Sequence, residues 1–140
     1  MESNLAMNDR SVQISLPFRF YDNRQKYLAF VNTTNEKPVI ARRAVQELTH
    51  LLPVPPALRI FDAGMGDGSV LAHLMRGTHH RFPTLPLYVV AKEISLEDVR
   101  LGLEKMPDRF QEHPATVLII TNMMYAEAHR LMPRDARVAA

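Results

Sequence analysis

The residues best suited to chemistry form a glycine turn between an apolar segment and a helical one. The turn consists of Gly64, Met65, Gly66, Asp67 and Gly68, with Asp62 two residues before its first glycine. Glycine permits positive φ and leaves no Cβ between the backbone and a ligand. A helix that follows such a turn presents free N–H groups and the positive end of its dipole to a docked group. The turn is therefore the candidate ligand site.

The spacing of these glycines separates ligand classes. A dinucleotide fingerprint, Gly-x-Gly-x-x-Gly, would need a third glycine at position 69, where the chain has Ser69. A P-loop would need Gly-Lys-Ser/Thr, which does not follow the turn. Nucleotide or dinucleotide binding stays open as an alternative, and so does a glycine-rich turn with no ligand.

Strands alternate with helices on both sides of this turn. Apolar patterning predicts strands at 58–62, 87–91 and 116–121, and helices at 69–76, 96–106 and 124–132. Gly77 is expected to end the first of these helices, and Ser95 to cap the second. The alternation predicts an α/β fold with a Rossmann-like parallel sheet and helices on both faces.

The residues before the sheet are expected to form an arm and a helical cap. We predict a loose N-terminal arm at 1–17, a cap or lid at 18–56, and a ligand-binding domain at 57–140. The cap should hold a short helix at 23–31, with Tyr27, Phe30 and Val31 facing inward. A second helix should start at a Thr33–Glu36 capping box, carry Pro38 in its first turn and run to Leu52. The prolines at 53, 55 and 56 should end it.

The segment from Phe61 to Gly68 resembles motif I of the class I S-adenosylmethionine-dependent methyltransferases. The resemblance covers about residues 58–125. It implies that the glycine turn cradles the amino-acid part of S-adenosyl-L-methionine. It also implies that Asp62 helps to hold the turn and the ammonium end of the methionine. The cofactor residues in the turn would be Asp62, Gly64, Met65, Gly66 and Gly68.

Two further cofactor residues follow from the same resemblance. The family places an acid after the second strand to bind the ribose hydroxyls, and Glu93 stands there. Asn122 matches the position near the adenine, although an aspartate is commoner there. Because Lys92 should point to the other side of the strand, we expect Glu93 to lack a cationic partner and to serve the ligand more than the fold. The long separation of Gly64 and Glu93 is assigned to a loop at 78–86.

Other candidates are weaker. Tyr21, Arg24 and Tyr27 could contact the cofactor as part of a lid, but ordinary helix packing explains them better. His79 and His80 lack a third ligand at suitable spacing, so loop surface is favoured over a metal site, and no metal is expected.

The resemblance implies a seven-stranded sheet in the order 3-2-1-4-5-7-6, but only three strands are evident. The chain ends where a fourth strand is expected. The first strand would then be an open apolar edge, which an oligomer or a partner chain could cover.

Two functions stay open. One is methyl transfer to a small-molecule acceptor, with unknown catalytic residues and an open question of whether this chain alone is active. The other is a truncated, non-catalytic cofactor-binding or interaction module.

Composition limits the kinds of partner and the cellular location that we expect. The chain has 140 residues, a net charge of +2 and no cysteine. No basic run indicates nucleic-acid binding, and no apolar run approaches the ~20 residues of a membrane span. Residues 1–10 lack the apolar region of a signal peptide. We therefore expect a cytoplasmic protein.

Overall fold

A computed structural model describes residues 26, 29–30, 33–135 and 137 of the chain. Its centre is a parallel sheet of three strands, β1 (Leu58–Asp62), β2 (Leu87–Lys92) and β3 (Thr116–Thr121), in the order β1-β2-β3. This order matches the first three strands of the predicted 3-2-1 arrangement. The chain thus has an α/β fold with an incomplete Rossmann-like sheet, as predicted.

The strand register brings the carboxyl ends of the strands to one edge. Asp62 pairs with Ala91, which in turn pairs with Ile120. Parallel strands share direction, so whatever follows each of them is delivered to the same edge of the sheet. The glycine turn, Glu93 and Asn122 all follow strands, and therefore meet there.

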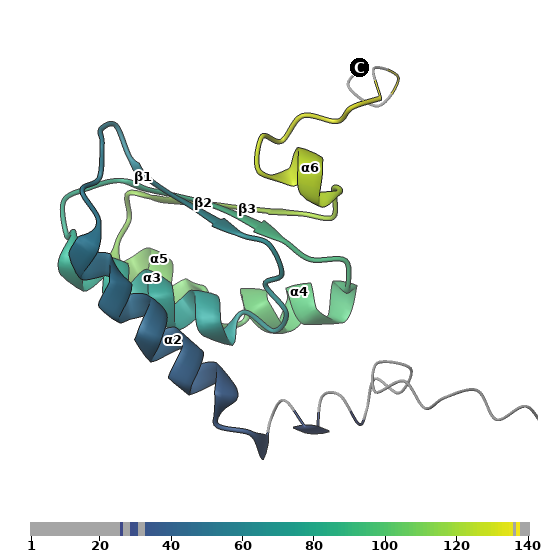
Figure 1. Cartoon of the computed structure of the whole chain (residues 1–140), viewed down its shortest axis with the longest axis horizontal. Coiled ribbons are helices and arrows are strands. Elements are labelled where there is room, and N and C mark those ends of the chain that lie inside the picture. Colours follow the sequence, from purple (N-terminus) through teal and green to yellow (C-terminus); the bar gives the residue numbers. More distant parts are fainter. Residues whose placement is uncertain (1–25, 27–28, 31–32, 136, 138–140) are drawn as a thin grey trace, which may run out of the picture. The chain divides into compact units, whose positions relative to one another are not determined.

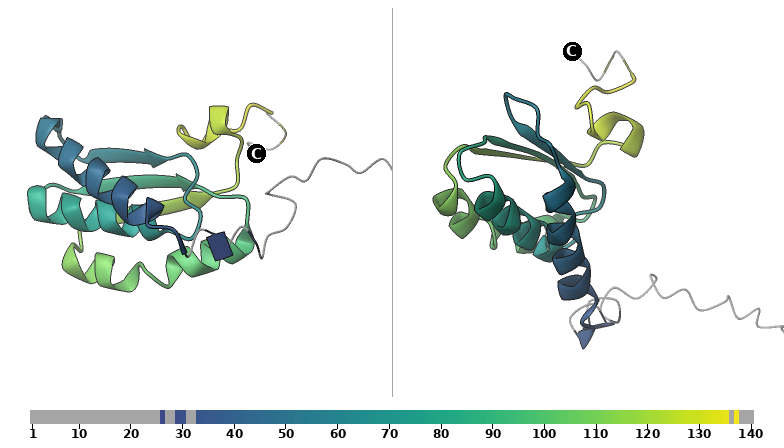
Figure 2. Two further views of the ribbon diagram at one scale, coloured as in Figure 1. Left: turned by 60° about the horizontal axis from the view of Figure 1, so that its bottom comes forward. Right: turned by 60° about the vertical axis from the view of Figure 1, so that its left-hand side comes forward.

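Four helices cover one face of the sheet (Figure 1 and Figure 2). They are α2 (Glu36–Glu47), α3 (Ser69–Arg81), α4 (Leu96–Leu103) and α5 (Pro107–Glu112). Alternate strand residues point toward them and form the core with apolar helix residues. The buried members are Leu58, Met65, Leu71, Met75, Leu87, Val89, Ala91 and Met106.

The second face of the sheet is covered differently. Within the described residues its only helix is the four-residue α6 (Tyr125–Ala128), which lies on the side opposite α3 and α4 (Figure 2). The Phe61 ring meets the His129 ring edge-on, with 6.0 Å between centroids. Phe61 is still 41% exposed, and Val117 is 53% exposed. Helices lie on both faces as predicted, but the second layer is thin.

The prediction that Gly77 ends helix α3 at residue 76 is wrong. The helix continues through Gly77 to Arg81 because α2 packs against it at that point. A Cβ on Gly77 would lie 2.6 Å from a methyl group of Val45. Gly77 therefore allows a close helix–helix contact, and it does not cap the helix. The expected loop at 78–86 shrinks accordingly, and most of the extra length before Glu93 is helical.

Helix α4 is shorter than predicted. Ser95 caps it as expected, accepting a hydrogen bond from the Asp98 N–H at 3.2 Å. The helix ends at Leu103, and the unpredicted α5 begins at Pro107, a residue favoured in the first turn of a helix. The last predicted helix, 124–132, is reduced to α6.

Helix α2 starts at Glu36 with Asn35 as its N-cap, so the predicted Thr33–Glu36 capping box is wrong. The Thr33 hydroxyl instead donates to the carbonyl oxygens of Ala29 and Phe30 in the preceding turn. Pro38 does lie in the first turn of α2. The helix ends at Glu47, short of Leu52, and the chain continues as the 3₁₀ turn η2 (Leu48–His50).

Residues Thr34–Ala140 form one compact unit that includes α2, and Met1–Thr33 form another. In the latter, Lys26, Ala29 and Phe30 are helical, as the predicted helix at 23–31 requires. Phe30 is 45% exposed, contrary to its predicted inward position. Tyr27, Val31 and the predicted arm lie outside the described residues. No helix among the described residues is long and apolar enough to cross a membrane.

Candidate functional site

The glycine turn is tied to the end of β2 by backbone hydrogen bonds. The Met65 N–H donates to the Lys92 carbonyl at 3.0 Å, which extends the strand pairing one step past β1. Gly66 and Gly68 both have positive φ, at 52° and 73°. Such values strain any residue with a side chain, so the turn needs glycine at these two positions. The turn is therefore a fixed part of the sheet edge.

The three glycines have different surroundings. A Cβ on Gly68 would lie 2.8 Å from the Gly102 Cα, so Gly68 permits the turn to pack against α4. A Cβ on Gly64 or Gly66 would meet nothing within 4 Å. The backbone at these two residues therefore faces open space, as a ligand cradle requires. Gly64 has neither a close neighbour nor a positive φ.

Glu93 holds the turn from the neighbouring strand. One carboxylate oxygen accepts a 2.8 Å hydrogen bond from the Gly66 N–H. The other accepts from the N–H groups of Ile94 and Ser95, at 2.8 and 2.9 Å. We predicted that Glu93 serves the ligand more than the fold; the structure shows that it also has a part in the fold, because three backbone N–H groups donate to its carboxylate. A carboxylate offers about four acceptor positions, which leaves one for a ligand hydroxyl.

Asp62 lies at the end of β1, beside the turn. Its Oδ1 accepts a hydrogen bond from the Gly64 N–H at 3.1 Å, so it does hold the turn. Burial raises the pKa of Asp62, the Gly64 hydrogen bond lowers it, and the charge of Glu93 raises it further; the net shift is upward. A cation near Asp62 would favour the ionised form of its carboxyl group.

Asp67 forms a second polar cluster that sequence reasoning did not find. Its Oδ1 lies 2.6 Å from the Lys37 Nζ on α2, and its Oδ2 accepts from the Ser69 hydroxyl at 2.8 Å. Lys105 donates to the Asp67 carbonyl at 2.7 Å. Burial alone would raise the pKa of Asp67, but the hydrogen bonds from Lys37 and Ser69 hold it below its usual value. This cluster fixes the outer side of the turn to α2 and to the end of α4.

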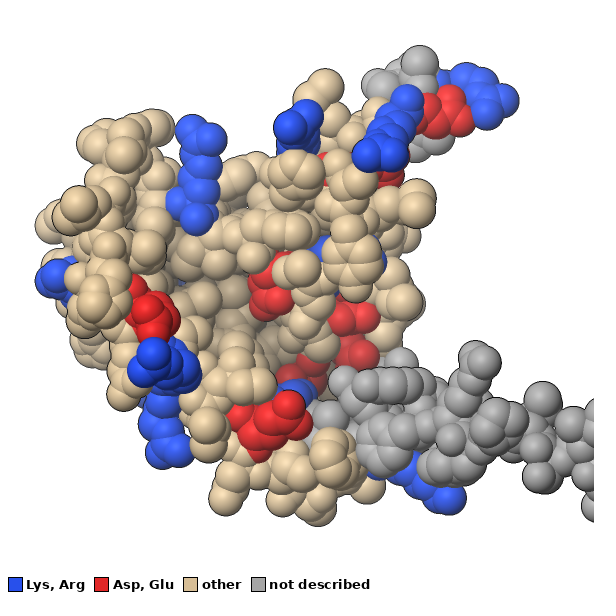
Figure 3. Space-filling view, in the orientation of Figure 1, with Lys and Arg blue, Asp and Glu red and all other residues tan. Residues whose placement is uncertain are grey.

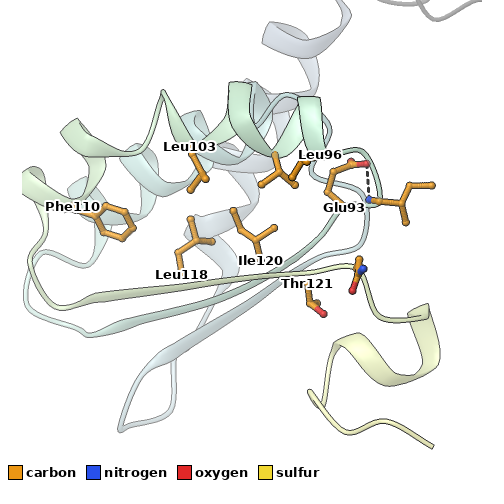
Figure 4. Close-up of a pocket in the computed structure, with 10 residues that line it drawn as sticks. Glu93, Leu96, Leu103, Phe110, Leu118, Ile120 and Thr121 are labelled. Atoms are coloured by element: carbon orange, nitrogen blue, oxygen red, sulfur yellow. Dashed lines mark hydrogen bonds between the residues drawn. The ribbon is translucent and has the colours of Figure 1, made fainter. Parts of the chain in front are cut away.

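Glu93 also lines a cavity of about 580 Å³ between α4 and β3 (Figure 4). Glu93, Ile94, Thr121 and Asn122 lie at the end formed by the sheet edge. The rest is apolar, with side chains of α4 and β3 pointing toward one another (Figure 4). The apolar lining is Leu96, Val99, Leu103, Phe110, Leu118 and Ile120. Glu93 and Asn122, predicted from separate strands, therefore line one cavity.

Met65 differs from the other predicted site residues. Its side chain is 4% exposed and belongs to the core, where it lies against Gly102. Only its backbone belongs to the turn. The predicted lid residues Tyr21, Arg24 and Tyr27 lie outside the described residues.

Lys92 points to the second face of the sheet, away from Glu93, as expected. Its Nζ lies 4.4 Å from the centroid of the Tyr125 ring, a cation–π contact.

The prediction that His79 lies on a surface loop is wrong. His79 is in the last turn of α3, and it is buried. Its ring stacks on that of His113, with centroids 4.8 Å apart. Glu112 Oε2 is 3.5 Å from the His79 Nδ1, yet neither ring nitrogen makes a hydrogen bond. Burial lowers the pKa of His79 more than Glu112 raises it. Across the described residues, no group of three or more His, Cys, Asp and Glu side chains is placed to hold a metal ion.

Charge on the face seen in Figure 1 is unevenly distributed. In Figure 3, acidic side chains lie near the centre of this face, while basic ones lie chiefly around its margin.

Comparison with protein-family models, curated proteins and solved structures finds no match to this chain. The geometry of the site and the motif are therefore the basis for a functional assignment.

Proposed function

We propose that this chain binds S-adenosyl-L-methionine at the glycine turn, as the cofactor-binding portion of a methyltransferase that acts on a small molecule. The observation that carries the proposal is the open space beside the backbone of Gly64 and Gly66. Both lie at the carboxyl edge of a parallel sheet, and a Cβ on either would meet nothing within 4 Å. Ligands of open α/β sheets bind at this edge.

The charge around the turn suits this ligand. S-adenosyl-L-methionine carries an ammonium and a sulfonium, both positive. The charge of Glu93 helps to raise the pKa of Asp62, after burial as the main cause. A bound cation would offset their repulsion. A phosphate-bearing dinucleotide would instead add negative charge beside two carboxyl groups, so the electrostatics favour the sulfonium cofactor.

The polar groups of the cavity fit the rest of the cofactor. Glu93 keeps an acceptor position for a ribose hydroxyl, and Asn122, on the cavity wall, offers an amide for the adenine edge. The cofactor would supply an electrophilic methyl group and its own leaving group. The residues of this chain would bind and orient it, which is the main protein contribution to such a transfer.

Isothermal calorimetry of the whole chain tests the proposal. S-adenosylhomocysteine, the demethylated product, should bind saturably, and NAD should neither bind nor compete. Binding of NAD without binding of S-adenosylhomocysteine would refute the assignment.

A second candidate is a non-catalytic cofactor-binding or interaction module. It is favoured by the thin second layer, because Phe61 on β1 and Val117 on β3 stay exposed there. The two functions differ in turnover. Labelled S-adenosyl-L-methionine and a panel of small hydroxyl and amine acceptors should give labelled product if the chain is an enzyme. Cofactor binding without any transfer would support the module.

The absence of cysteine further leads us to infer a cytoplasmic location.

A further inference from the structure

Strand β3 is the edge of the sheet farthest from β1, and its outer side is unpaired among the described residues. Its sequence, Thr-Val-Leu-Ile-Ile-Thr, has no charge, proline or glycine. Proteins commonly protect exposed edges with charges, prolines or bulges. Charge and proline are missing from β3, so this edge is suited to pairing with another strand.

The helix beside this edge has an exposed apolar stripe. Leu96 and Leu103 of α4 are 83% and 49% exposed, and Phe110 of α5 is 38% exposed. Ile94, in the loop before α4, is 78% exposed. These side chains and β3 line the apolar part of the cavity of Figure 4, so the stripe and the strand edge form one surface. The polar end of that cavity, at Glu93 and Asn122, is the part assigned above to the cofactor. Contiguous exposed apolar surface of this kind marks interaction sites. We call this surface, made by Ile94, Leu96, Leu103, Phe110 and the outer edge of β3, the β3-edge surface.

We propose that the β3-edge surface binds a second copy of this chain, with the two β3 strands pairing antiparallel about a twofold axis. An axis normal to the sheet pairs the two edges and keeps both helix layers on the same face. It also brings the two α4 helices alongside each other in opposite directions. Closed twofold dimers are the commonest protein oligomers, and their interfaces are self-complementary.

The spacing on α4 fits its own reversed copy. Leu96, Val99 and Leu103 follow the three-then-four spacing of a helix-pairing seam. In an antiparallel pair centred near Val99, Leu96 of each copy faces the partner's Leu103. The stripe thus meets an equivalent stripe without a change of register.

The charges on this side also favour a second copy over a strongly charged partner. The apolar residues and β3 carry no charge, so a charged protein or nucleic acid finds no complement there. The rim carries both signs, since Arg100 and Glu104 form an exposed ion pair at 3.6 Å on α4. Neither sign therefore dominates the rim that a reversed copy would meet.

Disulfide trapping tests the pairing directly, because the chain has no cysteine of its own. In a twofold antiparallel pair only the residue on the axis faces its own copy, so cysteine is placed singly at each position of β3 from Thr116 to Thr121. Antiparallel strands bring facing Cα atoms within about 4.5–5.5 Å, which a disulfide can span. Mild oxidation should link one of these variants into a dimer much faster than the exposed β1 control, Arg59→Cys. No cross-link in the β3 series, or one equally fast with Arg59→Cys, would overturn the proposal.

Analytical ultracentrifugation of the full chain provides the second test. The wild type should dimerise as concentration rises. Leu96→Glu and Leu103→Glu should weaken the dimer more than about tenfold, because each buries two unpaired charges at the interface. Leu52→Glu, at a position 92% exposed outside this surface, is the matched control and should dimerise like the wild type. A wild type that is monomeric at every concentration, or a dimer weakened only by Leu52→Glu, would overturn the proposal. Circular dichroism of each variant checks that the fold is kept.

Discussion

The Glu93 carboxylate accepts a 2.8 Å hydrogen bond from the Gly66 N–H and so joins the end of β2 to the turn that follows β1. The two residues are 27 positions apart in the chain. With the bonds from Ile94 and Ser95, this contact fixes two loops at the carboxyl edge of the sheet. Glu93, which we expected to serve mainly the ligand, is thus also part of the scaffold that shapes the site.

Glu93→Ala should therefore destabilise the protein without any ligand. Hydrogen bonds to a charged group contribute roughly 1.5–3 kcal/mol, and three backbone donors lose their acceptor. We expect a loss of about 1–3 kcal/mol, since water can replace part of what is lost at this half-buried position. Thermal melting measures it. Glu104→Ala, at an exposed i,i+4 pair on α4, is the control and should change little. Equal melting of Glu93→Ala and wild type would contradict this role.

Substitution by alanine should destabilise the protein at Gly68 and should leave its stability almost unchanged at Gly64. Gly68→Ala forces a side chain into a φ of 73°, a strain of about 1–2 kcal/mol. It also places a Cβ 2.8 Å from the Gly102 Cα, which adds a packing cost of roughly 1–3 kcal/mol. Gly64→Ala meets no neighbour and should stay within about ±0.5 kcal/mol of the wild type. Urea unfolding of both variants checks the contrast, and a Gly64→Ala that unfolds as easily as Gly68→Ala would refute it.

Asp62→Asn should separate stability from binding. Because the pKa of Asp62 is raised in the folded protein, the unfolded chain ionises first as the pH rises from 3.8. The Asp62 charge therefore costs stability above that pH, and the cost is complete once the pH passes the folded pKa. Asparagine keeps an acceptor for the Gly64 N–H and removes the charge. The variant should melt at or above the wild-type temperature at pH 7, yet bind S-adenosylhomocysteine more weakly. A variant that melts lower at pH 7 and binds normally would show the reverse division of roles.

His79 should make the protein sensitive to mild acid. Burial lowers its pKa in the folded state, so the unfolded chain takes up a proton more readily. Its contribution to stability is complete above the unfolded value of about 6.5 and is lost as the pH falls below it. His113, Glu112 and Arg109 surround the ring and set this balance. His79→Phe keeps an aromatic ring against His113 and cannot take up a proton. Unfolding free energies between pH 7.5 and 5 should therefore fall less in the variant, and parallel curves would contradict this assignment.

Local patterns in the sequence predicted much of the fold. Strand periodicity gave all three strands to within one residue, and Ser95 caps α4 as its type and position indicate. The errors occurred where a distant contact overrides local preference. Gly77 ends no helix because Val45 of α2 packs against it, and no pattern around Gly77 reveals that neighbour.

The site shows the same division. The glycine turn and Asp62 were found from spacing, since a turn between a strand and a helix is a local feature. The Lys37–Asp67 contact was missed because its partners lie 30 positions apart, on different elements. Glu93 was correctly placed at the sheet edge, but its bond to Gly66 depends on how two loops meet, which no single segment encodes.

Calorimetric titration of S-adenosylhomocysteine into wild type and Gly64→Ala tests the central claim most directly, because this substitution should leave the apo protein unchanged. If the open backbone at Gly64 cradles the cofactor, a methyl group there occupies ligand space. The wild type should then bind saturably, and Gly64→Ala should bind more than about tenfold more weakly, a loss of about 1.4 kcal/mol, with the same melting temperature. Equal affinity in a fully folded Gly64→Ala, or no binding by the wild type, would contradict the account.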